Sequence, residues 1–382
     1  MRPNIKGAIR PWQGEGHAPG LALPCCHDAA KRNTVSTAAE DHPTMRRLLL
    51  LATILFLPAA APPPAVPVYR QFGHWFVACD NTRACVARGF DEATSAQLDL
   101  IRPAGDAPPT LTLAAEDPVD PAALRLDGKP FPLPAPAWTS KDGAVSTSDP
   151  AAVDAFVAAA RNAQSIALDA APSGDDAPRT VPLDGFTAAV LLVDAVQGRP
   201  GTATALIAPR GTAAVPAAPP VPAAPAWTPP PPLTRAETAS LLRQARSLRS
   251  VAFESCDVRD PPEVFALDAT RALAIRPCYM AAYQGSSVVA VLPRGGGSPV
   301  PVKLALPGLP EDATEGPDMV DPEFDPASGT LTTVSKGRGL ADCGSSESWV
   351  WSRGAFRLTA LSYQNQCGGA APGDWPTLFR TR

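Results

Sequence analysis

The segment 215–232 constrains the fold of this chain most strongly, because nine of its 18 residues are proline. Proline fixes φ and lacks a backbone N–H, so such a segment forms neither a helix nor a sheet ladder and adopts an extended polyproline conformation. We expect a Pro/Ala-rich linker at 214–232 between two domains, one at 68–213 and one at 233–382. The alternative is a ligand for a partner domain that binds proline helices.

The remaining sequence is compatible with globular domains. Proline and glycine supply 47 and 28 of the 382 residues, which is below the roughly 25–30% typical of a disordered chain. Two domains of about 150 residues each are large enough to bury a hydrophobic core. Proline is therefore expected in the linker and the loops.

The region 45–61 has the layout of a secretory signal peptide. Met45-Arg46-Arg47 precedes a ten-residue apolar run, and the small residues 59–61 follow it. Ten residues span only about 15 Å as a helix, too short for a hydrocarbon core of about 30 Å. A buried core helix is the alternative. Residues 1–44 show no hydrophobic periodicity, and we expect them to be an untranslated or disordered extension.

The charge of the chain argues against nucleic acid as a partner. The formal net charge is −4, and removing residues 1–61, which hold seven basic and four acidic residues, leaves −7. Binding of phosphate backbones requires clustered cations. We expect no transmembrane span in the mature chain. Since the signal region contains no lipobox cysteine, we also expect no lipid anchor.

Six cysteines remain after the signal region, an even number that suits an oxidising compartment. Six cysteines allow 15 pairings, and the order along the chain favours local pairs. These pairs are Cys79–Cys85, Cys256–Cys278 and Cys343–Cys367. The first is the best supported, because turn residues separate two β-like runs there. The alternative is a metal site, but there is no C-x2-C pair and only one histidine, His74, follows the signal region. We therefore expect no metal and no cofactor.

The pattern of strands and helices predicts an α+β fold with antiparallel sheets. In the first region we expect strands at 75–79, 84–90, 96–101 and 110–113. A helix should begin at Asp149, with Pro150 in its first turn, and a second helix should run from 186 to 197. In the second region, 234–237 forms a capping box. A β-hairpin is expected over 349–361.

The two regions could be a weak internal duplication. The segment 160–169 aligns with 245–254, Leu183-Asp184 with Leu267-Asp268, and 209–211 with 293–295, at offsets of 84 or 85. Both copies would contain, in this order, a helix, a strand, a loop, the pair Leu-Asp, a helix and a strand. A coincidence of composition is the alternative.

Few residues in the chain are candidates for catalysis or ligand binding. His74 alone could serve as an imidazole base, and a structural role is the simpler interpretation. The sequence holds no nucleophile, phosphate-binding or dinucleotide motif. The run 311–325 has seven acids and no base, so it could bind calcium or supply a carboxylate pair to a hydrolase. A solvated loop is the simpler interpretation. Arg243, Arg246 and Arg249 recur every three residues on one face, which we interpret as a solvated face.

A binding patch is the remaining candidate for a site. Its candidate residues are Trp349, Trp351, Arg353, Lys336 and Arg338. Exposed aromatic and arginine side chains are enriched at interfaces, although tryptophans on a strand can equally pack in the sheet.

The second region resembles a bacterial exported family called domain of unknown function 1176. The residues that carry the resemblance lie in the blocks 278–284, 324–331, 336–344, 349–358 and 367–368, and Trp75, Cys79-Asp80-Asn81 and Cys85 continue it. The first region is similar, more faintly, to the invasion-associated locus B proteins through 126–128, 153–163 and 183–189. The resemblance implies a Gram-negative periplasmic or secreted protein and supplies no catalytic residues.

The prediction is therefore an exported envelope protein that acts as a non-enzymatic binding or accessory module. One alternative is an envelope-directed hydrolase that uses carboxylates of the second domain. Another is a secreted enzyme inhibitor. The partner is expected to be an envelope or periplasmic protein or ligand.

Overall fold

The computed structural model describes residues 63–92, 96–168, 179–253, 255–310, 314–368 and 373–382. The chain divides into two units, Met1–Ala59 and Ala60–Arg382, and every described residue belongs to the second. The predicted extension at 1–44 and signal peptide at 45–61 lie outside the described residues. None of the helices in the described ranges is long and apolar enough to cross a membrane.

The first half of the described chain is built on a seven-stranded antiparallel sheet in the order β1-β2-β3-β4-β5-β9-β8. Its strands are β1 Val68–Phe72, β2 Trp75–Cys79, β3 Cys85–Phe90, β4 Gln97–Arg102, β5 Thr110–Ala114, β8 Thr139–Lys141 and β9 Ala144–Thr147. The predicted strands are confirmed to within two residues. A smaller sheet contains β6 Arg125–Leu126, β7 Lys129–Pro130, β10 Ser165–Ala167 and β11 Thr180–Pro182.

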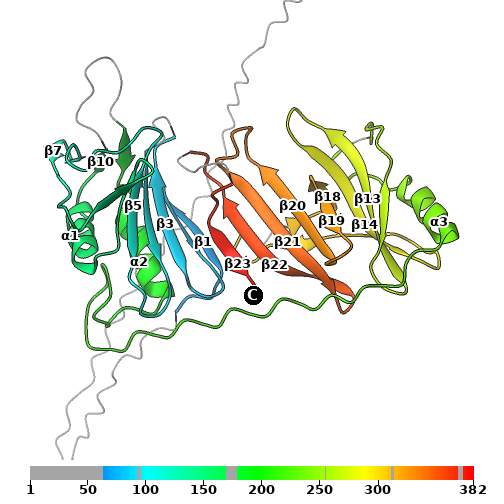
Figure 1. Ribbon diagram of the computed structural model, residues 1–382, viewed down its shortest axis with the longest axis horizontal. Coiled ribbons are helices and arrows are strands. Elements are labelled where there is room, and N and C mark those ends of the chain that lie inside the picture. The colour runs from blue at the N-terminus through cyan, green and yellow to red at the C-terminus, as the bar shows by residue number, and fades with distance from the viewer. Residues whose placement is uncertain (1–62, 93–95, 169–178, 254, 311–313, 369–372) are drawn as a thin grey trace, which may run out of the picture. The chain divides into compact units, whose positions relative to one another are not determined.

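Two helices, α1 Pro150–Ala160 and α2 Phe186–Val196, cover one face of the seven-stranded sheet (Figure 1). The predicted cap of α1 is confirmed, because the Asp149 side chain accepts a hydrogen bond from the Ala152 N–H at 2.8 Å. The helices and the sheet enclose the largest apolar cluster, which includes Trp75, Leu98 and Phe186. Alternate residues of β2 therefore point to opposite, buried faces.

The second half contains two five-stranded antiparallel sheets and one small sheet. The first has β12 Glu263–Ala266, β13 Arg271–Met280, β14 Gly285–Pro293, β15 Val300–Pro301 and β18 Asp318–Val320. The second has β19 Glu323–Asp325, β20 Thr330–Lys336, β21 Gly344–Ser352, β22 Ala355–Gln364 and β23 Thr377–Arg380. The small sheet pairs β16 Leu304–Ala305 with β17 Thr314–Glu315. The fold class, α+β with antiparallel sheets, is confirmed, as is the hairpin of β21 and β22.

The sheet of β12–β15 is buried on both faces, because its residues alternate between two cores. One core lies under α3, Arg235–Ala245, and includes Leu241, Ala274 and Ala290. The other includes Leu273, Val289 and Trp349 and joins this sheet to β19–β22. The capping box of α3 is confirmed, with the Glu237 N–H donating to Thr234 Oγ1 at 3.2 Å and the Thr234 N–H donating to Glu237 Oε2 at 2.7 Å.

The proline-rich segment contains no helix or strand, and it runs in an extended path (Figure 1). It is fastened to the second half by hydrogen bonds. Ala224 N–H donates to the Arg382 carbonyl at 2.9 Å, and Ser352 Oγ donates to the Ala226 carbonyl at 2.8 Å. The Trp227 ring packs above Gly329, where an added Cβ would lie 2.2 Å from the ring. The segment therefore contributes to a core as well as connecting two regions, and the division into two domains stays a prediction.

The internal duplication is not shown. Leu183-Asp184 leads into α2, whereas Leu267-Asp268 leads into β13. The first segment has β10 at 165–167, whereas no strand occupies the described residues of 250–254. Apart from the helix ends at Ala160 and Ala245, the similar residues occupy different elements in the two halves.

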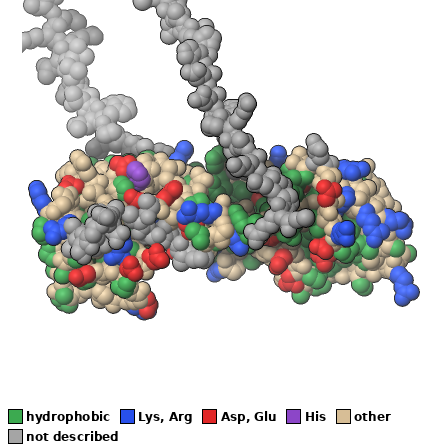
Figure 2. Space-filling view, turned by 90° about the horizontal axis from the view of Figure 1, so that it is seen from above, with side chains coloured by type: hydrophobic (Ala, Val, Ile, Leu, Met, Phe, Trp, Pro, Cys, Tyr) green, Lys and Arg blue, Asp and Glu red, His purple; other side chains and the backbone are tan. Residues whose placement is uncertain are grey.

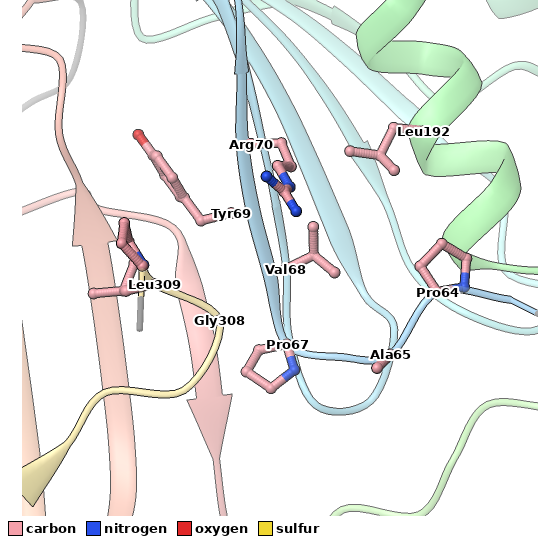
Figure 3. Close-up of a pocket in the computed structure, with 10 residues that line it drawn as sticks. Pro64, Ala65, Pro67, Val68, Tyr69, Arg70, Leu192, Gly308 and Leu309 are labelled. Atoms are coloured by element: carbon pink, nitrogen blue, oxygen red, sulfur yellow. The ribbon is translucent and has the colours of Figure 1, made fainter. Parts of the chain in front are cut away.

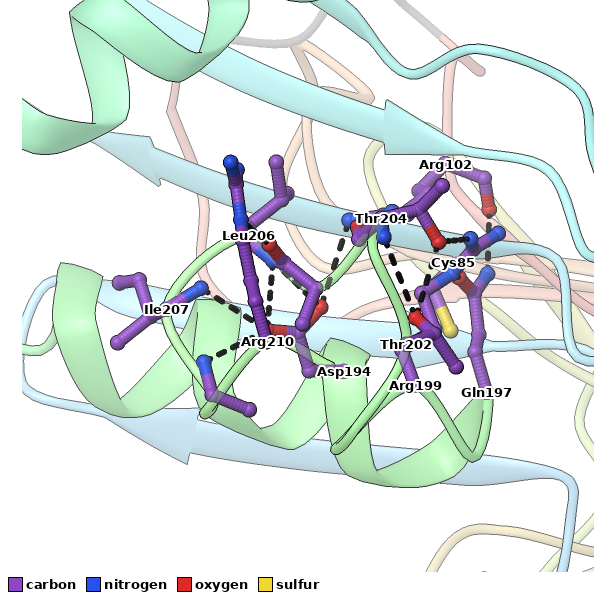
Figure 4. Close-up of polar contacts among 12 residues, drawn as sticks. Cys85, Arg102, Asp194, Gln197, Arg199, Thr202, Thr204, Leu206, Ile207 and Arg210 are labelled. Atoms are coloured by element: carbon purple, nitrogen blue, oxygen red, sulfur yellow. Dashed lines mark hydrogen bonds and ion pairs between the residues drawn. The ribbon is translucent and has the colours of Figure 1, made fainter. Parts of the chain in front are cut away.

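The loop 199–213 is held on α2 by a buried polar cluster (Figure 4). Asp194 Oδ2 accepts hydrogen bonds from the N–H groups of Leu206, Ile207 and Ala208 at 2.9–3.0 Å. Arg102 donates to Asp194 Oδ1 at 3.4 Å, and burial together with the charge of Arg199 lowers the pKa of Arg102 to about 10. The cluster serves the fold, because its carboxylate is saturated by the loop.

Contacts between distant segments join β2 and β3 to the end of the chain. Arg380 Nε lies 2.8 Å from Asp80 Oδ2, and the Arg380 N–H donates to Asn81 Oδ1 at 3.0 Å. A small apolar cluster, including Phe76, Phe90 and Leu378, fills the same contact. Residues almost 300 positions apart therefore complete one packed region.

Candidate functional site

Exposed apolar side chains lie at the tip of the β13–β14 hairpin and on the segment 334–340, which contacts that tip. We call these five side chains the apolar patch, and their exposed fractions run from 37% to 66%; they are Tyr279, Met280, Tyr283, Val334 and Leu340. Scattered single apolar residues are normal on a protein surface, whereas a contiguous group marks an interaction site. The patch is therefore the leading candidate for a functional site among the described residues.

An irregularity in β13 explains why Tyr279 and Met280 are both exposed. Side chains alternate between the two faces of a regular strand, so consecutive exposed residues require a break in the register. The pairing of β13 with β14 shifts between Pro277 and Tyr279. This shift turns the side chains at the end of the strand toward the surface, as β-bulges do next to many functional sites.

Gln284 ties the hairpin tip to β20. Its Nε2 donates to the Val334 carbonyl at 2.6 Å, and its Oε1 accepts from the Lys336 N–H at 2.8 Å. Gly339 lies against the ring of Tyr283, where an added Cβ would be 3.7 Å from Cδ1. These contacts bring Tyr283, Val334 and Leu340 into one surface, although up to 57 positions separate them in the sequence.

Two disulfides brace the apolar patch. Cys256–Cys278 adjoins Tyr279, and Cys343–Cys367 anchors the end of the loop 337–343, which carries Leu340. The Gly337 N–H also donates to the Cys343 carbonyl at 2.9 Å. These two bonds and Cys79–Cys85 confirm the three predicted pairs. The backbone beneath the patch is cross-linked, so binding there costs little ordering entropy.

The border of the apolar patch includes one aromatic ring and two carboxylates. Phe253 stacks on Tyr279 with ring centroids 4.6 Å apart. Beside Tyr279 and Met280 lies a shallow pocket of about 350 Å³ that Asp321 and Glu323 also line. Asp321 holds the hairpin, because its Oδ1 accepts from the Gly285 N–H at 2.7 Å.

The five residues of the sequence-predicted binding patch fall in three places. Lys336 and Arg338 border the apolar patch, and Arg338 Nε donates to Asp342 Oδ1 at 2.8 Å, which lowers the pKa of Asp342. Trp351 and Arg353 line a different pocket. Trp349 is only 1% exposed and lies in the core. The structure therefore does not bring the five together.

The residues of the apolar patch were missed as site residues, although four of them lie in the blocks that carry the family resemblance. The available signal was the run Tyr279-Met280-Ala281-Ala282-Tyr283, which breaks the alternation of a strand. Consecutive large apolar residues at the end of a strand cannot all face one core. Leu340 gave no such signal, because its exposure depends on the loop that Cys343 closes.

His74 forms a pair with Asp184. Their Nδ1 and Oδ1 atoms lie 2.6 Å apart, with more than half of each side chain exposed. Gly185 makes this approach possible, because it has φ 96° and an added Cβ would lie 1.8 Å from the Phe72 carbonyl oxygen. Among the described residues, which omit 93–95, no serine, threonine or cysteine lines the pocket of about 390 Å³ beside His74. Within that part of the chain the pair has no adjacent side-chain nucleophile of these three kinds.

The acidic run 311–325 is only partly described, since 311–313 lie outside the described residues. Asp318 Oδ2 accepts from the Val251 and Ala252 N–H groups at 2.8 and 3.1 Å, so it stabilises a neighbouring loop. The one group of potential metal ligands found in the described ranges is Asp342, Cys343 and Cys367. There the two thiols are joined in a disulfide. The calcium hypothesis stays a prediction.

Two carboxylates of the second half lie near each other, with Glu347 buried and Glu315 partly buried. Burial and the charge of Glu347 raise the pKa of Glu315 to about 7, and burial raises the pKa of Glu347. Glu347 Oε2 accepts from Thr333 Oγ1 at 2.7 Å, while its Oε1 has no partner among the described residues. Glu347 is 2% exposed, so a substrate would reach it only if the sheet opened.

A pocket of about 710 Å³ lies along β1 (Figure 3). Tyr69 and Leu309 lie on one side of the strand, and Leu192 of α2 lies on the other. Residue 62, two positions before the wall residue Pro64, and residue 311, directly after the wall residue Pro310, lie outside the described residues. We assign no function to this pocket.

The arginine stripe at Arg243, Arg246 and Arg249 is exposed and makes no ion pair among the described residues. Figure 2 shows basic side chains gathered at the end of the molecule that carries α3. This arrangement fits the predicted solvated face.

The fold and surface together define a class of protein: a disulfide-braced, antiparallel α+β protein with an exposed apolar patch. Residues 69–382 match a family described as protein of unknown function (DUF1176), and the chain belongs to this family. The predicted resemblance to it is confirmed, whereas the resemblance of the first region to the invasion-associated locus B proteins is not.

One relative supports the assignment. The chain is 31% identical over 336 residues to "Uncharacterized protein YpfG" of Escherichia coli (strain K12). The match covers 83% of this chain and 94% of that protein. No solved structure matches the chain.

Proposed function

We propose that the protein is an exported, non-enzymatic binding module of the bacterial envelope, and that the apolar patch is its docking surface for a partner protein. The observation that carries this proposal is the exposure of five apolar side chains on two segments that contact each other, 279–284 and 334–340, beside two disulfides. Exposed tyrosine, methionine and leucine side chains lose unfavourable contact with water when a partner covers them.

The proposed location is the periplasm or the exterior of the cell, after cleavage of a signal peptide at 45–61. Three disulfides fit an oxidising compartment, because thiols in the cytosol are kept reduced. Intact mass of the natively produced protein, with thiol alkylation in the absence of reductant, tests this. We expect a chain that begins after residue 57 and carries no alkylatable thiol. A chain that retains residues 1–44 with free thiols contradicts the proposed export.

The docking surface is tested by site-specific photo-crosslinking in the native host. A photoreactive phenylalanine at Tyr283 should yield a cross-linked species of one defined mass, identified by mass spectrometry. The matched control is the same residue at Val300, an exposed apolar position outside the patch. The variant Leu340→Ser, with the photoreactive residue still at 283, should reduce the yield.

Either of two results contradicts the docking proposal. One is equal cross-linking from positions 283 and 300, which indicates non-specific contact. The other is a yield that Leu340→Ser leaves unchanged. The alternative of an enzyme inhibitor uses the same surface and predicts that the captured partner is an enzyme whose activity falls on binding.

A further inference from the structure

A second cavity, distinct from the apolar patch, lies where three distant segments converge. We call it the Trp pocket; it has a volume of about 380 Å³ and is lined by 226–228, 267–271 and 351–354. This volume is at the lower end of the range for small-molecule sites, which favours a single ring over a chain. The proline-rich segment supplies one wall, and it is fixed there because Ser352 Oγ donates a hydrogen bond to the Ala226 carbonyl at 2.8 Å.

The cationic group of the pocket is Arg271, and its geometry is fixed. Its guanidinium lies 5.1 Å from the ring centroid of Trp351. Nε donates to Asp268 Oδ2 at 2.9 Å and Nη1 donates to the Gly354 carbonyl at 2.9 Å. Nη2 has no hydrogen-bond partner among the described residues. A guanidinium held in this way offers a pre-organised donor to an anion.

Asp268, the only acid among the described residues that line the pocket, already has all its hydrogen-bond acceptors occupied. Its Oδ1 accepts from the Thr270 N–H, the Thr270 hydroxyl and the Arg271 N–H, at 2.8–2.9 Å. Its Oδ2 accepts from Arg271 and, at 3.3 Å, from Trp351 Nε1. Although burial opposes it, the hydrogen bonds from Thr270 and the charge of Arg271 lower the pKa of Asp268. This carboxylate therefore remains ionised and neutralises one of the pocket's two arginines.

The second arginine, Arg353, leaves the pocket with a net positive charge. It occupies the turn between β21 and β22 in the left-handed region, with φ 51°. Its side chain is exposed and forms no ion pair among the described residues. The hydroxyl side chains of Thr228 and Thr270 and the indoles of Trp227 and Trp351 complete the walls.

We propose that the Trp pocket binds an acidic sugar, with the carboxylate of a uronic acid bound between Arg271 and Arg353. Two guanidinium groups and one saturated carboxylate select an anion. Indole and hydroxyl groups suit the apolar face and the hydroxyls of a sugar ring. The site is independent of the docking surface proposed above, since no residue of the apolar patch lines it.

The test is titration of the disulfide-bonded protein with D-glucuronate, followed by calorimetry and tryptophan fluorescence. We expect saturable binding with a dissociation constant in the millimolar range or tighter, and at least about tenfold weaker binding of D-glucose. Arg353→Asn should weaken glucuronate binding about tenfold. Asparagine tolerates the left-handed backbone, and Arg353 makes no ion pair that the fold would lose. Arg271→Gln should abolish binding, and Arg249→Asn, an exposed arginine elsewhere, is the matched control.

Four results overturn the proposal. The first is no binding of glucuronate at about 10 mM, where a millimolar site saturates. The second is equal affinity for glucose and glucuronate. The third is an affinity that Arg353→Asn leaves unchanged. The fourth is equal or tighter binding of inorganic phosphate, or of a tripeptide with a free carboxyl end, either of which would identify another class of ligand.

Discussion

Glu315 and Glu347 are the residues whose environment departs most from the sequence expectation. The acidic run that contains Glu315 suggests a solvated loop, yet burial and the charge of Glu347 raise its pKa to about 7. Glu347 belongs to β21, in which Trp349 and Trp351 are also buried. The sequence around Glu347 gives no sign that Glu315, 32 positions earlier, packs near it.

Glu315→Gln should make stability less dependent on pH. The pKa of Glu315 is about 7 in the folded state and ordinarily 4.5, so between these pH values the folded protein binds more protons than the unfolded chain. The stability that the protonated Glu315 carboxyl contributes is complete below about pH 4.5 and is lost as pH rises through about 7. We expect the variant to gain roughly 1–3 kcal/mol relative to the wild type at pH 8. Urea unfolding at pH 5 and pH 8 measures this.

Glu323→Gln, which removes an exposed carboxylate from the same run, is the control for Glu315→Gln. If both variants change the pH dependence equally, the effect comes from general charge and the buried pair does not cause it.

Interactions between residues close together in the sequence were sufficient to predict the helix starts and the disulfide pairs. Asp149, Thr234 and Glu237 act within one turn of chain, and Cys79 and Cys85 are opposite each other across one hairpin. Elements formed by distant segments could not be predicted in this way. Trp227 reads as part of a spacer, and only its packing against Phe324 and Gly329, about 100 positions later, makes it a core residue.

Asp149→Ala should destabilise α1 by about 1 kcal/mol, because the Ala152 N–H loses its acceptor at the start of the helix. Asp149→Asn retains an acceptor oxygen and should recover most of this loss. Denaturant unfolding monitored by circular dichroism compares the two variants. Equal destabilisation by alanine and asparagine would show that the charge of Asp149, and not its capping hydrogen bond, matters.

The three disulfides should differ in their contribution to stability. Cys343–Cys367 closes 24 positions of chain and Cys79–Cys85 only six. Loop-closure entropy predicts that replacing the longer pair by serine costs about 1 kcal/mol more. Thermal unfolding of the two double variants tests this order. The reverse order would mean that native packing around Cys79 outweighs the entropy of the unfolded chain.

Arg88 joins segments from both halves of the molecule. Its guanidinium donates to Asp99 Oδ1 and Oδ2 at 2.9 and 2.8 Å, and to Gln364 Oε1 and the Asp374 carbonyl at 2.8 and 2.9 Å. Arg88, Asp99 and Gln364 are nearly inaccessible. The sequence offered no signal for this network, since it spans 286 positions.

Arg88→Met should cost about 3–5 kcal/mol, because it leaves Asp99 as a buried charge without its cation. The double variant Arg88→Met, Asp99→Leu should recover a large part of the loss, since it removes the unpaired charge. Urea unfolding of both variants provides the comparison. If the double variant is no more stable than the single one, the hydrogen bonds to Gln364 and Asp374 dominate.

The contact between Arg380 and the Asp80-Asn81 turn has a consequence for how the molecule is made. A ribosome that adds about 5–20 residues per second needs roughly 15–60 s to travel from residue 81 to residue 380. Throughout that interval the outer face of β2 and β3, with Phe76 and Phe90, lacks the complete β23 as a partner. The nascent chain therefore has a period, set by the length of its own coding sequence, in which a chaperone or translocation factor can bind it before the final structure closes.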